Sequence, residues 1–94
     1  MDDVIINSAG NVFADLGFSP EEAAILQMRA ELMNDLRKFL QAKKLTQVKA
    51  AEILGVSQSR VSDLIRGKWE RFSLEMLIIL STKAGMHVTL RTAE

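Results

Sequence analysis

The 94-residue chain contains no cysteine, a single histidine and no apolar stretch as long as a membrane span. The absence of cysteine excludes a disulfide framework and thiolate metal sites, and it suits a protein of the reducing cytosol. A membrane-spanning helix needs about 18 or more consecutive apolar residues, and the first residues do not show the pattern of a signal peptide. We therefore expect a cytoplasmic protein.

Motifs typical of enzymes are also missing. Serine is frequent, but there is no Gly-x-Ser-x-Gly sequence, no Ser–His–Asp set and no glycine-rich phosphate loop. His87 falls in a segment that alternates apolar and polar residues, so we expect it on the surface of a strand. We expect no enzyme, and accordingly no catalytic residue, no metal site and no cofactor.

The composition favours one small folded domain. Hydrophobic residues make up 48% of the chain, which is enough for a core and too much for a disordered tail. A domain of this length is only marginally stable alone.

The formal net charge of zero conceals a segregation of charge along the chain. Residues 1–36 carry seven acidic side chains and one basic one, whereas residues 37–71 carry nine basic and three acidic ones. Residues 72–94 carry two of each sign. A positive block of this kind is typical of a surface that binds nucleic-acid phosphates; the alternative is a solvated surface whose charges are merely segregated.

The basic block contains two short amphipathic segments joined by a tight turn, QVKAAEILGVSQSRVSDLIR at residues 47–66. Thr46 and Ser57 are good N-caps for the two helices, because their hydroxyls can accept from free backbone N–H groups. Gly55 stands where the chain must reverse with a positive φ. The small and apolar positions that would face inward are Ala50, Ala51, Ile53, Leu54, Val61, Leu64 and Ile65. Two helices fixed at an angle, with one polar end projecting, predict a helix-turn-helix that enters a DNA major groove.

This segment resembles the lambda-repressor-like helix-turn-helix family (Cro/cI, also called XRE). The matching residues are Gln47, Ala51, Gly55, Val61, Leu64 and the exit sequence Arg66-Gly67-Lys68. The wider strings NVFADLGFSPEEA and LTQVKAAEILGVSQSRVSDLIRGKWERFSLEML resemble the HigA-type antitoxin regulators within that family, over about residues 11–90. The resemblance implies a DNA-binding transcriptional regulator.

The polar face of the second predicted helix supplies the candidate base contacts. Gln58 could bond an adenine, Arg60 a guanine, and the short Ser59 either kind of base. Asp63 could accept from a cytosine amino group or could pair with Arg66, three residues further on.

Other residues are expected to hold the DNA backbone. By resemblance, Gln47 bonds a phosphate and braces Gln58, and Arg66 and Lys68 also contact the backbone. Arg60 departs from the small or polar residue common at its position in the family, so it could turn to a phosphate instead. The expected phosphate-contacting set is Gln47, Ser62, Arg66, Lys68, Lys43 and Lys44. Trp69 could lie against a sugar–phosphate edge or cover the loop below Phe72.

The flanking segments complete an all-α bundle with one short C-terminal strand. Residues 1–18 lack a sustained period and predict an extended arm, in which 4–6 could pair as a strand. Ser19-Pro20-Glu21-Glu22 predicts a helix start with a capping box, and the helix should run to about Ala42. Its front half would extend beyond the helix-turn-helix core. A last helix follows Ser73, and residues 86–91 predict a strand, so the folded domain spans 19–94.

The last helix is apolar nearly all round, which indicates that more than one of its sides is covered. The strand after it needs a partner, either its twin across a two-fold axis or the segment at 4–6. Both features predict a homodimer, which would bind an operator with an inverted repeat in double-stranded DNA.

Three functions fit these observations. The first is a dimeric repressor that also serves as the antitoxin of a type II pair, holding a basic toxin with its acidic N-terminal third and repressing its own operon. The second is a stand-alone prophage or host regulator of the same family, without a toxin. The third is a protein-binding scaffold that has kept the fold but not the DNA contacts.

Overall fold

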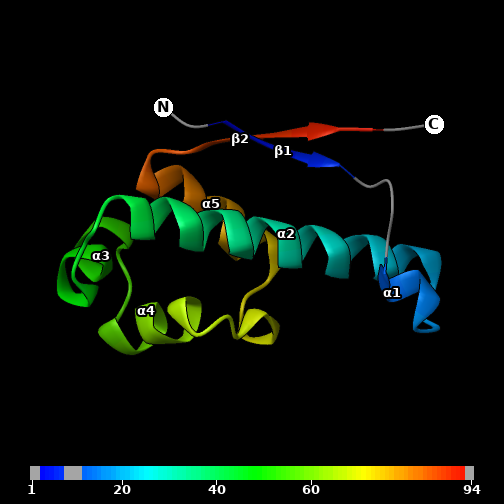
Figure 1. Cartoon of the computed structure of the whole chain (residues 1–94), viewed down its shortest axis with the longest axis horizontal. Coiled ribbons are helices and arrows are strands. Elements are labelled where there is room, and N and C mark those ends of the chain that lie inside the picture. The colour runs from blue at the N-terminus through cyan, green and yellow to red at the C-terminus, as the bar shows by residue number, and fades with distance from the viewer. Residues whose placement is uncertain (1–2, 8–11, 93–94) are drawn as a thin grey trace.

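The computed structural model describes residues 3–7 and 12–92, arranged around one long central helix (Figure 1). In chain order the elements are β1 (Asp3–Asn7), α1 (Val12–Asp15), α2 (Pro20–Ala42), α3 (Gln47–Leu54), α4 (Gln58–Ile65), the 3-10 turn η1 (Trp69–Arg71), α5 (Leu74–Ala84) and β2 (His87–Arg91). Helices α3 and α4 lie on one side of α2, and the two strands lie on the opposite side (Figure 1). The predicted all-α bundle with a central helix-turn-helix and a short C-terminal strand is confirmed.

Local sequence explains where the four longer helices begin. Ser19, Thr46, Ser57 and Ser73 each adopt an extended backbone, and each hydroxyl accepts from the N–H three residues later. This satisfies one of the backbone donors that the first turn of a helix leaves free. All four helix starts were predicted on these residues.

The two strands are the first and last described elements of the chain. They pair in parallel, with Asp3 opposite His87 and Asn7 opposite Arg91. The strand predicted at 4–6 is therefore confirmed, and of the two partners considered for the C-terminal strand the chain itself supplies one.

The sequence predicted an extended arm before α2, but this segment is not extended throughout. Residues 12–15 form the short helix α1, and Gly17 follows with a φ of +94°. The ring of Phe13 packs edge-on against Phe18 at 6.1 Å and against Trp69 at 5.9 Å. These tertiary contacts hold a helix that is too short to be recognised from hydrophobic periodicity.

The same contacts show what covers the front half of α2, which the sequence predicted would extend beyond the helix-turn-helix core. Helix α1, strand β1 and η1 all pack against α2. Arg29 of α2 lies over the Trp69 ring, 5.7 Å from its centroid. Trp69 therefore covers the inside of the fold rather than projecting toward a ligand.

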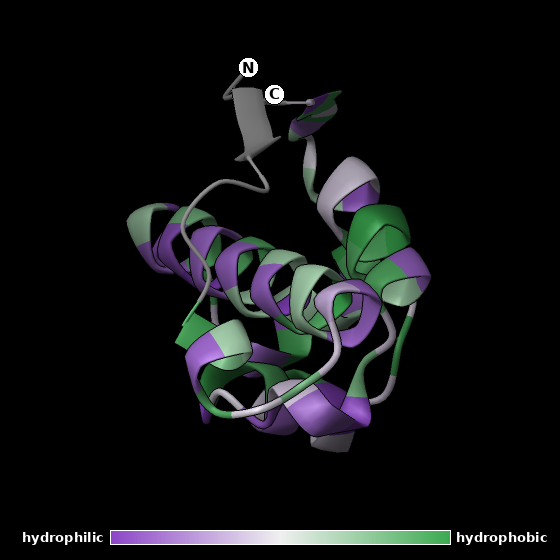
Figure 2. Cartoon of the chain, turned by 90° about the vertical axis from the view of Figure 1, so that its right-hand side faces the viewer, coloured by the Kyte–Doolittle hydropathy of each residue, from purple (hydrophilic) through white to green (hydrophobic). Residues whose placement is uncertain are grey.

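The core lies between α2, the helix-turn-helix and α5. Its fully buried large side chains are Leu32, Leu36, Leu54, Val61, Leu64, Phe72 and Leu77. Figure 2 shows hydrophilic and hydrophobic residues alternating along α2, as expected for a helix with one face in the core. Within residues 3–7 and 12–92, no helix combines the length and apolar character needed to cross a bilayer.

Candidate nucleic-acid interface

The turn between α3 and α4 is fixed by backbone hydrogen bonds and one glycine. Gly55 has a φ of +68°, and the N–H groups of Gly55 and Val56 both donate to the Ala51 carbonyl, at 2.9 and 3.1 Å. The Ser57 hydroxyl then accepts from the Arg60 N–H at 3.1 Å and starts α4. The predicted helix-turn-helix, including its capping residues and its glycine, is confirmed.

A second glycine fixes the exit of α4. Gly67 has a φ of +73°; its N–H donates to the Leu64 carbonyl, and the Lys68 N–H donates to the Asp63 carbonyl. This pair of bonds is a Schellman motif, which satisfies carbonyls at a helix C-terminus.

Helix α2 contributes directly to that exit. The Arg37 Nε donates to the Ile65 carbonyl at 3.0 Å, and a Cβ atom on Gly67 would lie 3.2 Å from Arg37 Nη1. The position therefore requires glycine for two reasons, its backbone conformation and the guanidinium beside it. The end of α4 is locked to the long helix.

The N-terminal tip of α4 is free. The side chains of Gln58 and Ser59 are exposed, and so is Gln47 at the start of α3. Among the described residues no hydrogen bond joins Gln47 to Gln58, so the bracing implied by the family resemblance is not made in this state. Two exposed polar side chains on a rigid, capped first turn suit contacts with base edges.

Arg60 is placed differently from its neighbours. Its Nη1 donates to the Arg71 carbonyl at 3.2 Å, and its guanidinium lies 5.1 Å from the centroid of the buried Phe72 ring. A charged group that holds a backbone carbonyl and stacks on an aromatic ring braces α4 against η1. In this position the Arg60 guanidinium is engaged within the fold.

The ion pair predicted for Asp63 forms with other partners. Its Oδ1 lies 3.9 Å from Lys68 Nζ, and its Oδ2 lies 3.4 Å from Arg71 Nη1; the side chain of Asp63 is only 18% exposed. Arg66 is not its partner, because the Schellman turn brings Lys68 and η1 back toward α4. Arg71 was not identified from the sequence as a functional residue, and only its place in the basic block pointed to it.

The remaining predicted phosphate contacts surround this helix pair. Lys43, Lys44 and Arg66 are exposed, whereas Ser62 is half-buried. Lys44 has a φ of +54° just after α2, and the Lys43 ammonium lies 5.0 Å from the centroid of the Phe39 ring. Lys49 of α3 pairs with Glu52 at 3.5 Å on the open surface.

One carboxyl group of α2 titrates abnormally. Burial raises the pKa of Asp35; the Lys38 ammonium opposes this shift, and the Glu31 carboxylate adds to it.

His87 lies on β2 with its side chain exposed, as predicted. Within residues 3–7 and 12–92, no group of three or more His, Cys, Asp or Glu side chains is placed to hold a metal ion.

Comparison with known proteins agrees with this geometry. The family model described as "Helix-turn-helix domain" matches residues 12–93, which includes every described element except β1. A comparison with curated proteins finds no match. The chain therefore belongs to the helix-turn-helix domain family, and its motif is that of a DNA-binding regulator.

Proposed function

We propose that the chain is a sequence-specific repressor that binds double-stranded DNA as a homodimer and regulates its own operon. The observation that carries the proposal is the free, capped tip of α4, with Gln58 and Ser59 exposed and the helix held at both ends. Such a tip can enter a major groove without rearrangement of the backbone. Lys43, Lys44 and Arg66, exposed around the helix pair, supply charge for the DNA phosphates.

The roles within the interface follow from the contacts that each residue already makes. Gln58 and Ser59 read bases, because nothing else in the described chain engages them. Arg60 acts first as a brace, and reading a guanine would require it to leave the Arg71 carbonyl. Gln47 and Ser62 contact phosphates at the edge of the groove. A direct role of Asp63 in base reading is less favourable than its ion pairs.

Binding to the promoter of its own gene tests this proposal. We expect fluorescence anisotropy to show tight, salt-sensitive binding and footprinting to show two half-sites whose centres lie about 34 Å apart, or a multiple of that distance. Gln58→Ala should cost roughly 1–3 kcal/mol at one base pair and leave non-specific binding unchanged. Lys44→Ala should lower affinity equally for all sequences and reduce the slope of log K against log salt by about 0.9. Absence of salt-sensitive binding to any duplex from the locus would refute the proposal.

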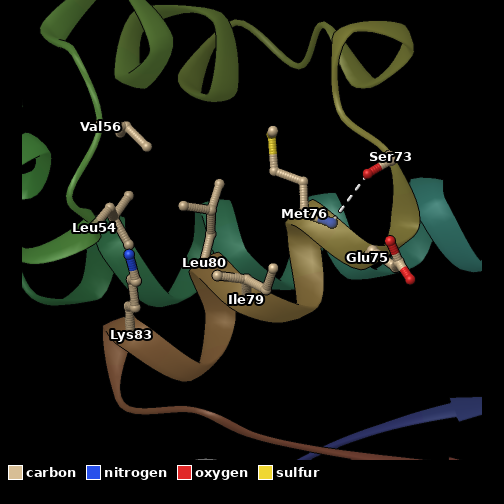
Figure 3. Close-up of a pocket in the computed structure, with 8 residues that line it drawn as sticks. All are labelled: Leu54, Val56, Ser73, Glu75, Met76, Ile79, Leu80 and Lys83. Atoms are coloured by element: carbon tan, nitrogen blue, oxygen red, sulfur yellow. Dashed lines mark hydrogen bonds between the residues drawn. The ribbon is translucent and has the colours of Figure 1, made fainter.

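A homodimer is supported by the outer face of α5. Ile78 and Ile79 are 37% and 54% exposed, and Ile79 lines a groove of about 300 Å³ together with Leu54, Val56 and Met76. Figure 3 shows Glu75 and Lys83 at opposite ends of this groove, with Ile79 between them. Residues 75, 79 and 83 recur every four positions, so they lie on one face of the helix.

This face is complementary to itself. If two copies of α5 pack antiparallel with Ile79 at the two-fold axis, Glu75 of each copy lies opposite Lys83 of the other, because both are four residues from Ile79. The apolar centre is buried and the charges pair at its rim. A two-fold dimer of this kind matches the inverted repeat of the proposed operator.

A charge exchange tests the dimer. Glu75→Lys and Lys83→Glu each place like charges across the interface and should weaken dimerisation by roughly tenfold, since two rim pairs are lost and reversed. The double variant should restore it, as measured by sedimentation equilibrium. Glu52→Lys, with the same change of charge on α3, is the control. Unchanged association of the single variants, or a double variant weaker than either, would contradict this geometry.

The antitoxin role is supported by a second surface, at the other end of α2 from α3 (Figure 1). Its exposed apolar residues are Val12, Leu16, Phe18 and Ile25, and its acidic ones are Asp15, Glu21 and Glu22. Apolar anchors within an acidic rim fit a basic protein. The alternative remains a stand-alone regulator that binds the same DNA without a toxin.

The neighbouring gene distinguishes these two functions. A small basic ribonuclease toxin encoded next to this chain should co-purify with it, and Leu16→Arg should abolish the complex. Leu90→Arg on β2 is a matched control, because the two leucines are 68% and 66% exposed. If the neighbour's product neither binds nor is neutralised, the stand-alone function holds. If the DNA experiment also fails, the chain is a protein-binding scaffold.

A further inference from the structure

Asp63 occupies an unusual position for an acidic residue. It lies in the last turn of α4, where its main-chain carbonyl accepts from the Lys68 N–H. A carboxylate near a helix C-terminus is disfavoured by the helix dipole. It also lies among the basic residues of the candidate interface, where a negative charge repels DNA. Both the helix dipole and the charge of DNA therefore disfavour an acidic side chain at this position.

The contacts of Asp63 suggest what it does. Each of its oxygens faces a different cation, Oδ1 toward Lys68 and Oδ2 toward Arg71. The separations of 3.9 and 3.4 Å exceed the 2.7–2.9 Å or so of a strong charge-assisted hydrogen bond. Two cations loosely paired with one small anion form a site that another oxyanion can take over at little cost.

The main chain at Lys68 and Arg71 is held by backbone hydrogen bonds that do not involve the Asp63 carboxylate. The Lys68 N–H is bonded within the Schellman turn, and the Arg71 N–H donates to the Lys68 carbonyl at 3.0 Å. The Arg71 carbonyl is itself held by Arg60. Loss of the Asp63 carboxylate would therefore leave both positive side chains presented at the exit of α4.

We propose that Lys68 and Arg71 form a phosphodiester-binding site that the Asp63 carboxylate occupies in the free chain. The inference rests on the proposed DNA-binding function and deepens it. A DNA phosphate displaces Asp63 when α4 is seated in the groove, and the cost of breaking the two ion pairs lowers the affinity of the chain for DNA. Arg71 becomes a contact to the DNA backbone, and Asp63 becomes a residue that sets affinity without touching DNA.

Substitution of the carboxylate by its neutral amide tests the site. Asp63→Asn should strengthen binding to the operator duplex by roughly 2- to 30-fold, the range expected when two partly exposed ion pairs no longer compete. The slope of log K against log salt for the operator should become steeper by up to about 1, because no displaced Asp63 carboxylate takes up a cation on binding. A duplex that does not seat α4 should gain no more affinity than the operator does.

The control is Glu70→Gln, which makes the same change of charge within η1 at an exposed side chain with no ion pair in the described chain. In a chain carrying Lys68→Gln and Arg71→Gln, Asp63→Asn should no longer increase affinity. Asp63→Ser serves if the amide variant is unstable in thermal unfolding. Equal effects of Asp63→Asn and Glu70→Gln, or a gain that persists without Lys68 and Arg71, would overturn the inference. Absence of salt-sensitive binding by the unmodified chain would instead overturn the proposed function.

Discussion

The close approach of Arg37 to Gly67 gives the most specific prediction about stability. In Gly67→Ala, the backbone at a φ of +73° costs an alanine about 1–2 kcal/mol. The new methyl group would also lie 3.2 Å from Arg37 Nη1, so the guanidinium must shift and its hydrogen bond to the Ile65 carbonyl is weakened. Losing part of a hydrogen bond to a charged donor adds about 1 kcal/mol, so the total is about 2–3 kcal/mol.

Thermal unfolding followed by circular dichroism measures this loss. At about 4–8 °C per kcal/mol for a domain of this size, Tm should fall by about 8–24 °C. Protein concentration must be held constant, since dimerisation would make Tm depend on it. A fall of less than about 4 °C would refute the reasoning, because it would lie below the backbone contribution alone.

A double-mutant cycle separates the two contributions. Arg37→Met keeps an unbranched side chain but removes the donor, so Gly67→Ala in that background should cost only its backbone term. The two changes should therefore be non-additive by about 1 kcal/mol. Gly85 ends α5 with the same pair of backbone bonds and a φ of +100°, but a Cβ there would have no neighbour within 4 Å. The effects of Gly85→Ala and Arg37→Met on the free energy of unfolding should thus be additive. Coupling between these two changes would show that non-additivity in the cycle does not measure a contact between the two residues.

Two further substitutions test buried polar groups. Asp35→Asn should raise Tm at neutral pH, because a raised folded-state pKa means that the ionised carboxyl costs stability; this cost is lost as pH falls through that pKa, and the gain should vanish below the ordinary value of 3.8. An equal gain at all pH values would show that charge is not the cause. Ser81→Ala should raise stability by about 1 kcal/mol, because the fully buried Ser81 hydroxyl has no hydrogen-bond partner among the described residues. A lower Tm for this variant would indicate that the hydroxyl is satisfied in solution.

Sequence reasoning was reliable where the cause of a structure is local. A capping hydroxyl such as that of Ser57 acts on an N–H three residues away, and Gly55 is required by the φ of one residue. Both causes are visible in a window of a few residues. The same holds for the glycine at the exit of α4, although the sequence did not reveal that Arg37 packs over it.

Predictions failed where a tertiary contact decides. The spacing of Asp63 and Arg66 favoured an ion pair along the helix, but the turn after Gly67 brings Lys68 and Arg71 closer. Arg60 stays a predicted base contact, but its contacts with the Arg71 carbonyl and the Phe72 ring were not visible in the sequence. Each of these outcomes depends on the path of the chain beyond α4, which helical periodicity does not specify.

The long helix shows how the two kinds of information combine. Its 23 residues and its start at Pro20 follow from the sequence, and so does the surplus length beyond the helix-turn-helix. What covers the surplus does not follow, because α1 and Trp69 cover it through tertiary contacts such as those of Trp69 with Phe13 and Arg29. After that covering, Ile25 is still 48% exposed and Leu16 is 68% exposed. This remaining surface lies at the opposite end of α2 from α3 (Figure 1), so a protein partner bound there would leave the tip of α4 free for DNA.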